Sequence, residues 1–98
     1  MSELHFEWDS RKDAFNRRKH KITFEEASTV FLDQNAHLYY DPDHSEDEDR
    51  YLIHGMSRTL RVLIVCYCYR KYDKIIRIIS ARQADKEETQ HYFRRYRL

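Results

Sequence analysis

The chain has 98 residues, of which 41% are hydrophobic and 14% aromatic, with one glycine and one proline. This composition fits one domain over residues 1–98 with one modest core, and it excludes a disordered chain or a flexible linker. The formal net charge of +1 excludes a general electrostatic affinity for nucleic acid. The charges are unevenly distributed, because residues 11–21 carry six Lys or Arg against one Asp, whereas residues 41–49 carry six acids and no base. We therefore expect one cationic and one anionic surface.

The sequence also indicates where in the cell the protein is located. Its first residues lack the charged and apolar regions of a secretory signal, and no run approaches the roughly 18 apolar residues of a membrane span. Cys66 and Cys68 lie two residues apart, too close to bridge each other comfortably and too few for a structural zinc site. Two free thiols and no membrane segment predict a cytoplasmic protein.

The N-terminal region alternates between apolar and polar residues over 4–8, which predicts a short strand with three inward side chains: Leu4, Phe6 and Trp8. Asp9 or Ser10 can then cap a helix that runs to about His20. The apolar stripe of this helix is thin and consists mainly of Ala14 and Phe15. Most of the helix should therefore face solvent or a ligand.

The sequence Thr23-Phe24-Glu25-Glu26 has the form of a capping box and predicts the start of a second helix. Ile22, just before it, is placed to pack against Ala27 as a hydrophobic staple. The helix should end near Asp33 and bury a stripe at helical spacing: Phe24, Ala27, Val30 and Phe31. These side chains are expected to form core.

Four more strands are predicted, over residues 37–41, 51–55, 60–69 and 74–82. Gly55 is the only glycine and marks either a turn or a close approach of two backbones. The charged segment 70–74 suits a hairpin loop, which makes the last two strands antiparallel neighbours. A second capping box at 85–88 opens a helix to about Arg97 with three inward residues: Tyr92, Phe93 and Tyr96. The predicted fold class is α+β, an antiparallel sheet with two N-terminal helices and one C-terminal helix.

The strand over 74–82 is rich in isoleucine but contains two arginines. With a strict period of two, Arg77 and Arg82 fall on different faces of the sheet. Each is either a paired structural charge or a phosphate contact, for which the planar guanidinium is well suited.

Most chemical motifs are excluded by the residues present. The segment that begins at Asp41 resembles a calcium loop, but its sixth position is Glu46 and its twelfth is Leu52. No two histidines have zincin spacing, and one glycine cannot build a nucleotide-binding loop. What remains is a set of cations, histidines and acids. This set suits metal-free cleavage of RNA, in which the 2′-hydroxyl attacks the neighbouring phosphorus with help from a base, an acid and cations.

The chain resembles the BrnT toxins of bacterial type II toxin–antitoxin systems. Four groups of residues carry the resemblance: 6–9; Asn16, 19–20, 23–27 and 30–31; Asp41, 44–45, Glu48 and Arg50; and 76–82, Glu88 and Tyr92. The stretch Ile76-Arg77-Ile78-Ile79-Ser80-Ala81-Arg82 is the most specific of them. One departure is Leu60 before Arg61, where many members have Gly-Arg or Asn-Arg.

The resemblance implies a RelE-like fold and a ribonuclease that stops growth by cleaving RNA. From the residues present we expect no cofactor. It also implies a toxin–antitoxin hetero-oligomer with a BrnA antitoxin, which carries a DNA-binding domain of ribbon-helix-helix type.

Carried over by position, the resemblance marks a set of polar residues as candidates: Lys19, His20, Glu25, Asp41, His44, Arg61, Arg77, Arg82 and Glu88. We expect the three arginines to converge on a phosphate, and His20 or His44 to transfer protons, with Glu25 as a further catalytic candidate. Glu25 and Glu88 have a competing role in the first turn of their helices, where a carboxylate favours the helix dipole. RNA would bind to the basic helix through Arg17, Arg18 and Lys19.

A different class of function stays open: a non-catalytic module that binds nucleic acid or protein through the basic helix 11–21 alone. A binding module needs exposed cations, whereas an enzyme needs them partly buried and convergent. For an antitoxin, the expected docking surface is this same helix together with three terminal arginines: Arg94, Arg95 and Arg97.

Overall fold

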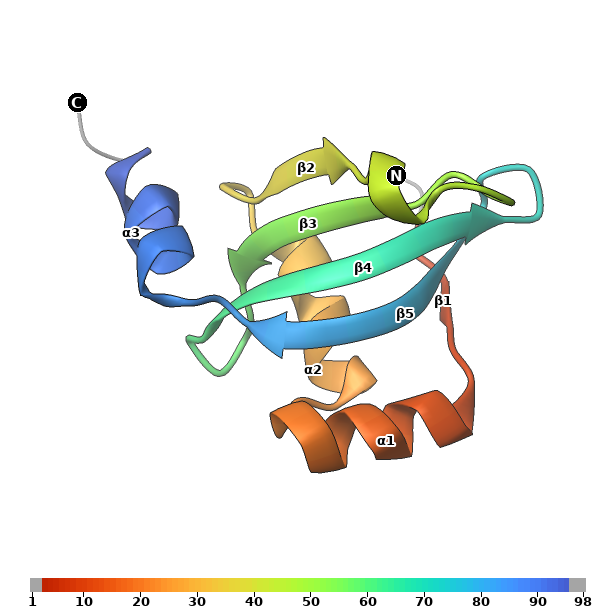
Figure 1. Cartoon of the computed structure of the whole chain (residues 1–98), viewed down its shortest axis with the longest axis horizontal. Coiled ribbons are helices and arrows are strands. Elements are labelled where there is room, and N and C mark those ends of the chain that lie inside the picture. Colours follow the sequence, from red (N-terminus) through yellow and green to blue (C-terminus); the bar gives the residue numbers. More distant parts are fainter. Residues whose placement is uncertain (1–2, 96–98) are drawn as a thin grey trace.

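The computed structural model of the chain describes residues 3–95. Its elements follow the predicted order: β1 (Phe6–Glu7), α1 (Ser10–His20), α2 (Phe24–Thr29), the 3-10 helix η1 (Val30–Leu32), β2 (His37–Tyr40), the 3-10 helix η2 (Pro42–His44), β3 (Tyr51–Met56), β4 (Val62–Arg70), β5 (Ile75–Gln83) and α3 (Lys86–Arg94). Figure 1 shows α2 across one face of the sheet, α1 alongside the edge of β5 and α3 at one end of the sheet. Tyr96 and Arg97, both named above, lie outside the described residues.

The five strands have the order β1-β5-β4-β3-β2. Strands β2 to β5 pair antiparallel, and the turn after Arg70 makes β4 and β5 a hairpin as predicted. The expectation of a purely antiparallel sheet is wrong, because β1 pairs parallel with β5. Alternation of apolar residues specifies the faces of a strand but not the direction of its neighbour, so the sequence pattern could not show this.

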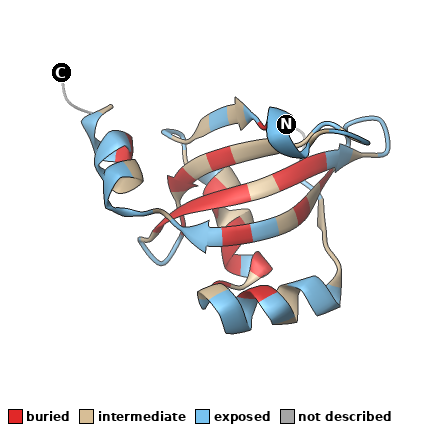
Figure 2. Cartoon of the chain, in the orientation of Figure 1, coloured by how far each residue is buried: buried red, intermediate tan, exposed pale blue. Residues whose placement is uncertain are grey.

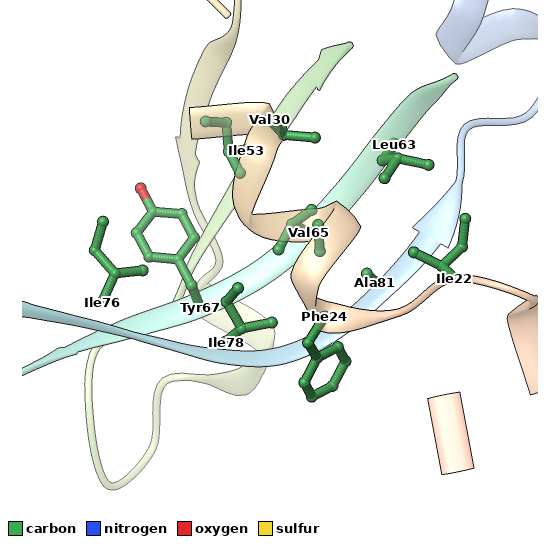
Figure 3. Packing of buried hydrophobic residues seen from close by; sticks show 11 residues of the cluster. Ile22, Phe24, Val30, Ile53, Leu63, Val65, Tyr67, Ile76, Ile78 and Ala81 are labelled. Atoms are coloured by element: carbon green, nitrogen blue, oxygen red, sulfur yellow. The ribbon is translucent and has the colours of Figure 1, made fainter. Parts of the chain in front are cut away.

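The core lies between the sheet and α2 (Figure 3). The predicted stripe of the second helix is largely confirmed, since Phe24, Ala27 and Val30 have no exposed surface. Central strand β4 is buried along most of its length (Figure 2). The inward prediction fails for Leu4 and Phe93, which are about half exposed, and Phe15 of the thin stripe on the first helix is 56% exposed.

Gly55 is explained by a close approach and not by a turn. It lies within β3, and a Cβ there would come within 2.7 Å of Val30 Cγ1 and 2.9 Å of Ala36 Cβ. Any side chain would thus push η1 away from the sheet.

A β-bulge in β5 reverses part of the predicted face pattern. Ile78 pairs with Tyr67 and Ser80 with Cys66, so that Ile79 is an extra residue between them. Arg77 lies opposite Cys68 and Arg82 opposite Ile64, and these two partners share one face of β4. Arg77 and Arg82 are therefore on the same face, not on different faces. We call this face, which points away from α2, the cavity face.

Candidate functional site

A cavity of about 340 Å³ opens on the cavity face and wraps around the edge of β5. It brings together three of the predicted catalytic residues, His20 from the end of α1, His44 from η2 and Arg82 from β5. The other lining residues are Asp41, Asp43, Leu52, Ile64, Cys66, Ser80 and Ala81. Two imidazoles and a guanidinium from distant parts of the chain thus surround one space.

Arg82 is held by a two-pronged ion pair. Its two terminal nitrogens donate to the two oxygens of Glu88, each at 2.8 Å. Glu88 also accepts from the backbone N–H of Asp85 and so completes the capping box of α3. The hydrogen bonds from Arg82 lower the pKa of Glu88 to about 2, against the opposing effect of burial. Glu88 therefore has the predicted structural role and also orients Arg82.

His44 is oriented by a buried carboxylate. Its Nδ1 lies 2.9 Å from Asp41 Oδ2, and the Asp41 side chain is 11% exposed whereas that of His44 is 66% exposed. A carboxylate can only accept, so Nδ1 carries the hydrogen, and in the neutral ring Nε2 is the acceptor. The Ser45 hydroxyl closes the turn by donating to Asp41 O at 2.5 Å and accepting from Arg50 N at 2.9 Å.

His20 is placed by a residue whose role the sequence did not reveal. Asn16 is buried in α1, and its side-chain amide bonds both backbone groups of Ala81, donating to the carbonyl at 2.8 Å and accepting from the N–H at 3.0 Å. It also donates to Ile22 O at 3.0 Å. The amide thus pairs with a part of β5 that lies beyond the reach of β1. Asn16 was noted only as part of the family resemblance, and no periodicity points to its contacts.

Arg77 is on the same face as Arg82 but does not line the cavity. Its guanidinium donates to Glu7 Oε2 at 2.6 Å, across the parallel pair of β1 and β5. The side chain is 29% exposed, so it can still meet a ligand that extends from the cavity along β5.

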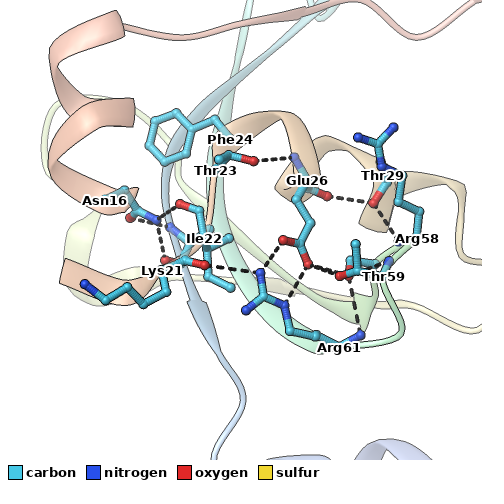
Figure 4. A network of polar contacts seen from close by, with 12 residues as sticks. Asn16, Lys21, Ile22, Thr23, Phe24, Glu26, Thr29, Arg58, Thr59 and Arg61 are labelled. Carbon is cyan, nitrogen blue, oxygen red and sulfur yellow. Dashed lines mark hydrogen bonds and ion pairs between the residues drawn. The ribbon is translucent and has the colours of Figure 1, made fainter. Parts of the chain in front are cut away.

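Arg61 does not converge with the other two arginines. It lies just before β4 and forms a two-pronged pair with Glu26 of α2, while also donating to Lys21 O at 3.2 Å (Figure 4). Glu26 accepts in addition from the hydroxyls of Ser57 and Thr59. Arg61 points toward α2 because it alternates in phase with the core side chains of β4.

Glu26 corrects the capping-box prediction for the second helix. The Thr23 hydroxyl caps the helix by accepting from Glu26 N at 3.0 Å, but the Glu26 carboxylate bonds Arg61, Ser57 and Thr59 instead of returning to the cap. The hydrogen bonds from Arg61 lower the pKa of Glu26 from its usual 4.5 to about 2, although burial opposes this.

The remaining candidates lie outside the cavity. Glu25 is 73% exposed and pairs loosely with Arg58 at 3.6 Å. Arg17, Arg18 and Lys19 are exposed on α1, with the Lys19 ammonium 5.7 Å from the Phe15 ring centre. These cations are free to contact a polyanion but are not placed for catalysis in the cavity.

Two further findings concern residues 3–95. No group of three or more His, Cys, Asp or Glu side chains among them is arranged to hold a metal ion. No helix in this range is long and apolar enough to cross a membrane.

We compared the chain with known protein families and solved structures. The family model described as "Ribonuclease toxin, BrnT, of type II toxin-antitoxin system" matches residues 8–88. The chain belongs to the BrnT family. The crystal structure of the Brucella abortus ribonuclease toxin BrnT is similar, with a TM-score of 0.65 and 20% sequence identity over 86% of this chain and 100% of that one. No curated protein matches the sequence.

The match covers every cavity-lining residue, since these lie between His20 and Arg82. It also covers the turn before β4, where the resemblance leads us to expect glycine or asparagine and this chain has Leu60. Leu60 has φ 66° and is 78% exposed. A left-handed backbone suits glycine or asparagine and costs leucine about 1 kcal/mol or more.

Replacing Leu60 by asparagine should therefore stabilise this BrnT protein by about 1 kcal/mol, or roughly 4–8 °C in Tm. Thermal unfolding followed by circular dichroism measures the change. Leu60→Ala is the matched control, because it removes the same exposed side chain but keeps a Cβ and the strain. An equal gain in both variants would attribute the effect to the lost apolar surface.

Proposed function

We propose that the chain is the toxin of a type II toxin–antitoxin system, a metal-independent endoribonuclease of RelE-like fold that acts in the cytoplasm as one 98-residue domain. Its activity would inhibit translation and growth, and a BrnA-like antitoxin with a DNA-binding domain would neutralise it in a hetero-oligomer. The observation that carries the catalytic part is the cavity in which His20, His44 and Arg82 meet.

In this proposal His44 is the base. Its Nε2 can accept the proton of a 2′-hydroxyl because Nδ1 donates to Asp41. The 2′-oxygen attacks the adjacent phosphorus, the bond from phosphorus to the 5′-oxygen breaks, and the leaving oxygen takes a proton from His20. The products are a 2′,3′-cyclic phosphate and a 5′-hydroxyl. Arg82 stabilises the charge that develops on the phosphoryl oxygens.

We assign the acid to His20 because it lies at the C-terminus of α1 and lines the same cavity as His44. RNA that reaches the cavity would also pass over α1, whose exposed Arg17, Arg18 and Lys19 can bind flanking phosphates. Arg77 would bind a phosphate next to the scissile one, since it shares the face of Arg82.

Purified protein should cleave single-stranded RNA in the presence of excess EDTA, at the rate seen without it. The measurement is the release of fragments from a labelled RNA, with the ends analysed for cyclic phosphate. Loss of cleavage in EDTA and its return with magnesium would overturn metal independence. RNA binding without cleavage under all conditions would instead favour the non-catalytic module, for which the exposed cations of α1 would suffice.

A further inference from the structure

Strand β2 forms the outer edge of the sheet, opposite the edge on which α1 packs (Figure 1). Its sequence is His37-Leu38-Tyr39-Tyr40. Natural edge strands are commonly protected from further pairing by lysine, proline or an inward charge. Residues 37–40 contain no lysine and no proline, so neither of these residues blocks pairing with another strand.

The hydrogen-bond pattern identifies the backbone groups that face outward. Just beyond β2, Asp41 N donates to Arg50 O at 2.9 Å, which makes Asp41 and Arg50 a hydrogen-bonded pair. Such pairs alternate along an antiparallel ladder, so residues 37 and 39 also bond to β3. The N–H and C=O groups of Leu38 and Tyr40 consequently point away from the sheet.

The side chains of the same two residues are exposed. Leu38 is 62% and Tyr40 52% accessible, on the face of the sheet that carries α2. We call Leu38 and Tyr40 the β2 edge surface. Free backbone groups beside exposed apolar side chains are what an added strand requires.

The charge around this surface defines the kind of partner. The acidic segment 41–49 follows β2 directly, and the Tyr40 hydroxyl donates to Asp49 at 3.1 Å. A complementary segment would place alternating apolar residues along β2 and basic residues beyond its Tyr40 end.

We propose that an extended apolar and basic segment of the antitoxin pairs with β2 as a sixth strand of the sheet. This rests on the proposed function, which supplies the antitoxin. It departs from the expectation that the basic helix is the docking surface, because α1 offers cations with little apolar surface beyond Phe15. The added strand would lie at the opposite edge from α1 and leave the exposed face of that helix uncovered.

A second copy of this chain fits the surface less well. In an antiparallel pair of β2 strands, the segment before His37 of one copy would lie beside the acidic segment of the other. Residues 32–36 contain an acid and no base, so no charge complementarity results. In a parallel pair the two acidic segments would lie together and repel each other.

The test compares Leu38→Glu with Leu60→Glu in binding to the antitoxin encoded by the gene next to that of this chain. Leu60 is the matched control, since it is an exposed leucine outside the surface. Leu38→Glu should weaken binding by about tenfold or more, whereas Leu60→Glu should change it less than about twofold. In the wild-type complex, the amide hydrogens of Leu38 and Tyr40 should exchange more slowly than in the free toxin.

Unchanged affinity of Leu38→Glu, unchanged exchange of the two amides, or weakening only by the double variant Arg17→Glu, Arg18→Glu would overturn the proposal. So would a dimer of the toxin alone that Leu38→Glu dissociates. Cleavage of RNA by the free variants is measured in parallel. If wild type fails to cleave RNA while Leu38→Glu loses the antitoxin, the ribonuclease assignment fails and the docking surface stands. If wild type cleaves RNA while Leu38→Glu binds the antitoxin with unchanged affinity, the ribonuclease assignment stands and the docking surface fails.

Discussion

Replacing Arg82 by alanine should lower the rate of RNA cleavage by about 10²–10³-fold, which corresponds to about 2–4 kcal/mol of lost transition-state stabilisation. Arg82 is the one guanidinium that lines the cavity together with His20 and His44 among residues 3–95. In the proposed mechanism, its removal leaves the developing phosphoryl charge without its positioned cation. Single-turnover cleavage of a labelled RNA at saturating protein measures the effect, and circular dichroism checks that the variant is folded.

Glu88→Gln is the matched control for this prediction. It breaks the same ion pair but keeps the guanidinium, so cleavage should fall far less than in Arg82→Ala. An equal loss in both variants would mean that Arg82 acts by anchoring α3 and not on the phosphate. Arg77→Ala should also impair cleavage, mainly through KM, because Arg77 lies outside the cavity on the same face.

Replacing Glu26 by glutamine should lower the free energy of unfolding by about 3 kcal/mol. Glu26 is 7% exposed and accepts from Arg61, Ser57 and Thr59, so the neutral amide leaves the Arg61 charge without its partner. Urea unfolding at pH 7 measures the change. Glu25→Gln is the control, since the neighbouring carboxylate is 73% exposed and its loss should cost less than about 0.5 kcal/mol.

The Glu26–Arg61 pair makes the stability of the fold depend on pH in a definite direction. The pKa of Glu26 is lowered from 4.5 to about 2 in the folded chain, chiefly by the hydrogen bonds from Arg61. Its contribution to stability is therefore complete above about pH 4.5 and is lost as the pH falls toward 2. Glu88 acts in the same interval, because its pKa is also about 2. Stability of the wild type should fall more steeply between pH 4.5 and 2 than that of Glu26→Gln, and parallel curves would contradict the role of Glu26.

Local signals in the sequence predicted most of the elements, because caps and periodicity depend on neighbouring residues. The order of helices and strands, the Asp85 capping box and the hairpin after Arg70 all followed from such signals. The pairing of strands and the position of the bulge did not follow from local signals. The bulge at Ile79 reversed the expected face of Arg82, and nothing in an isoleucine-rich run marks where a bulge falls.

Only part of the candidate site could be predicted, because local signals do not show which side chains meet in space. The family resemblance marked His20, His44 and Arg82, and the structure brings them to one cavity. The resemblance also grouped Arg61 with Arg82, although Arg61 faces α2. The partner of a charged residue is set by tertiary contacts, and Glu26 lies 35 positions away from Arg61 in the chain.

The amide of Asn16 has a consequence for the order of folding. An isolated helix of 11 residues is marginal in water, and α1 buries only Asn16. Its anchor is Ala81, 65 positions later in the chain, so closing this contact costs loop entropy that only an assembled β4–β5 hairpin can offset. We therefore predict that α1 docks late in folding. On this prediction His20, one turn beyond Asn16, would reach its place only then, and a growing chain would acquire this wall of the cavity after β5 has been synthesised.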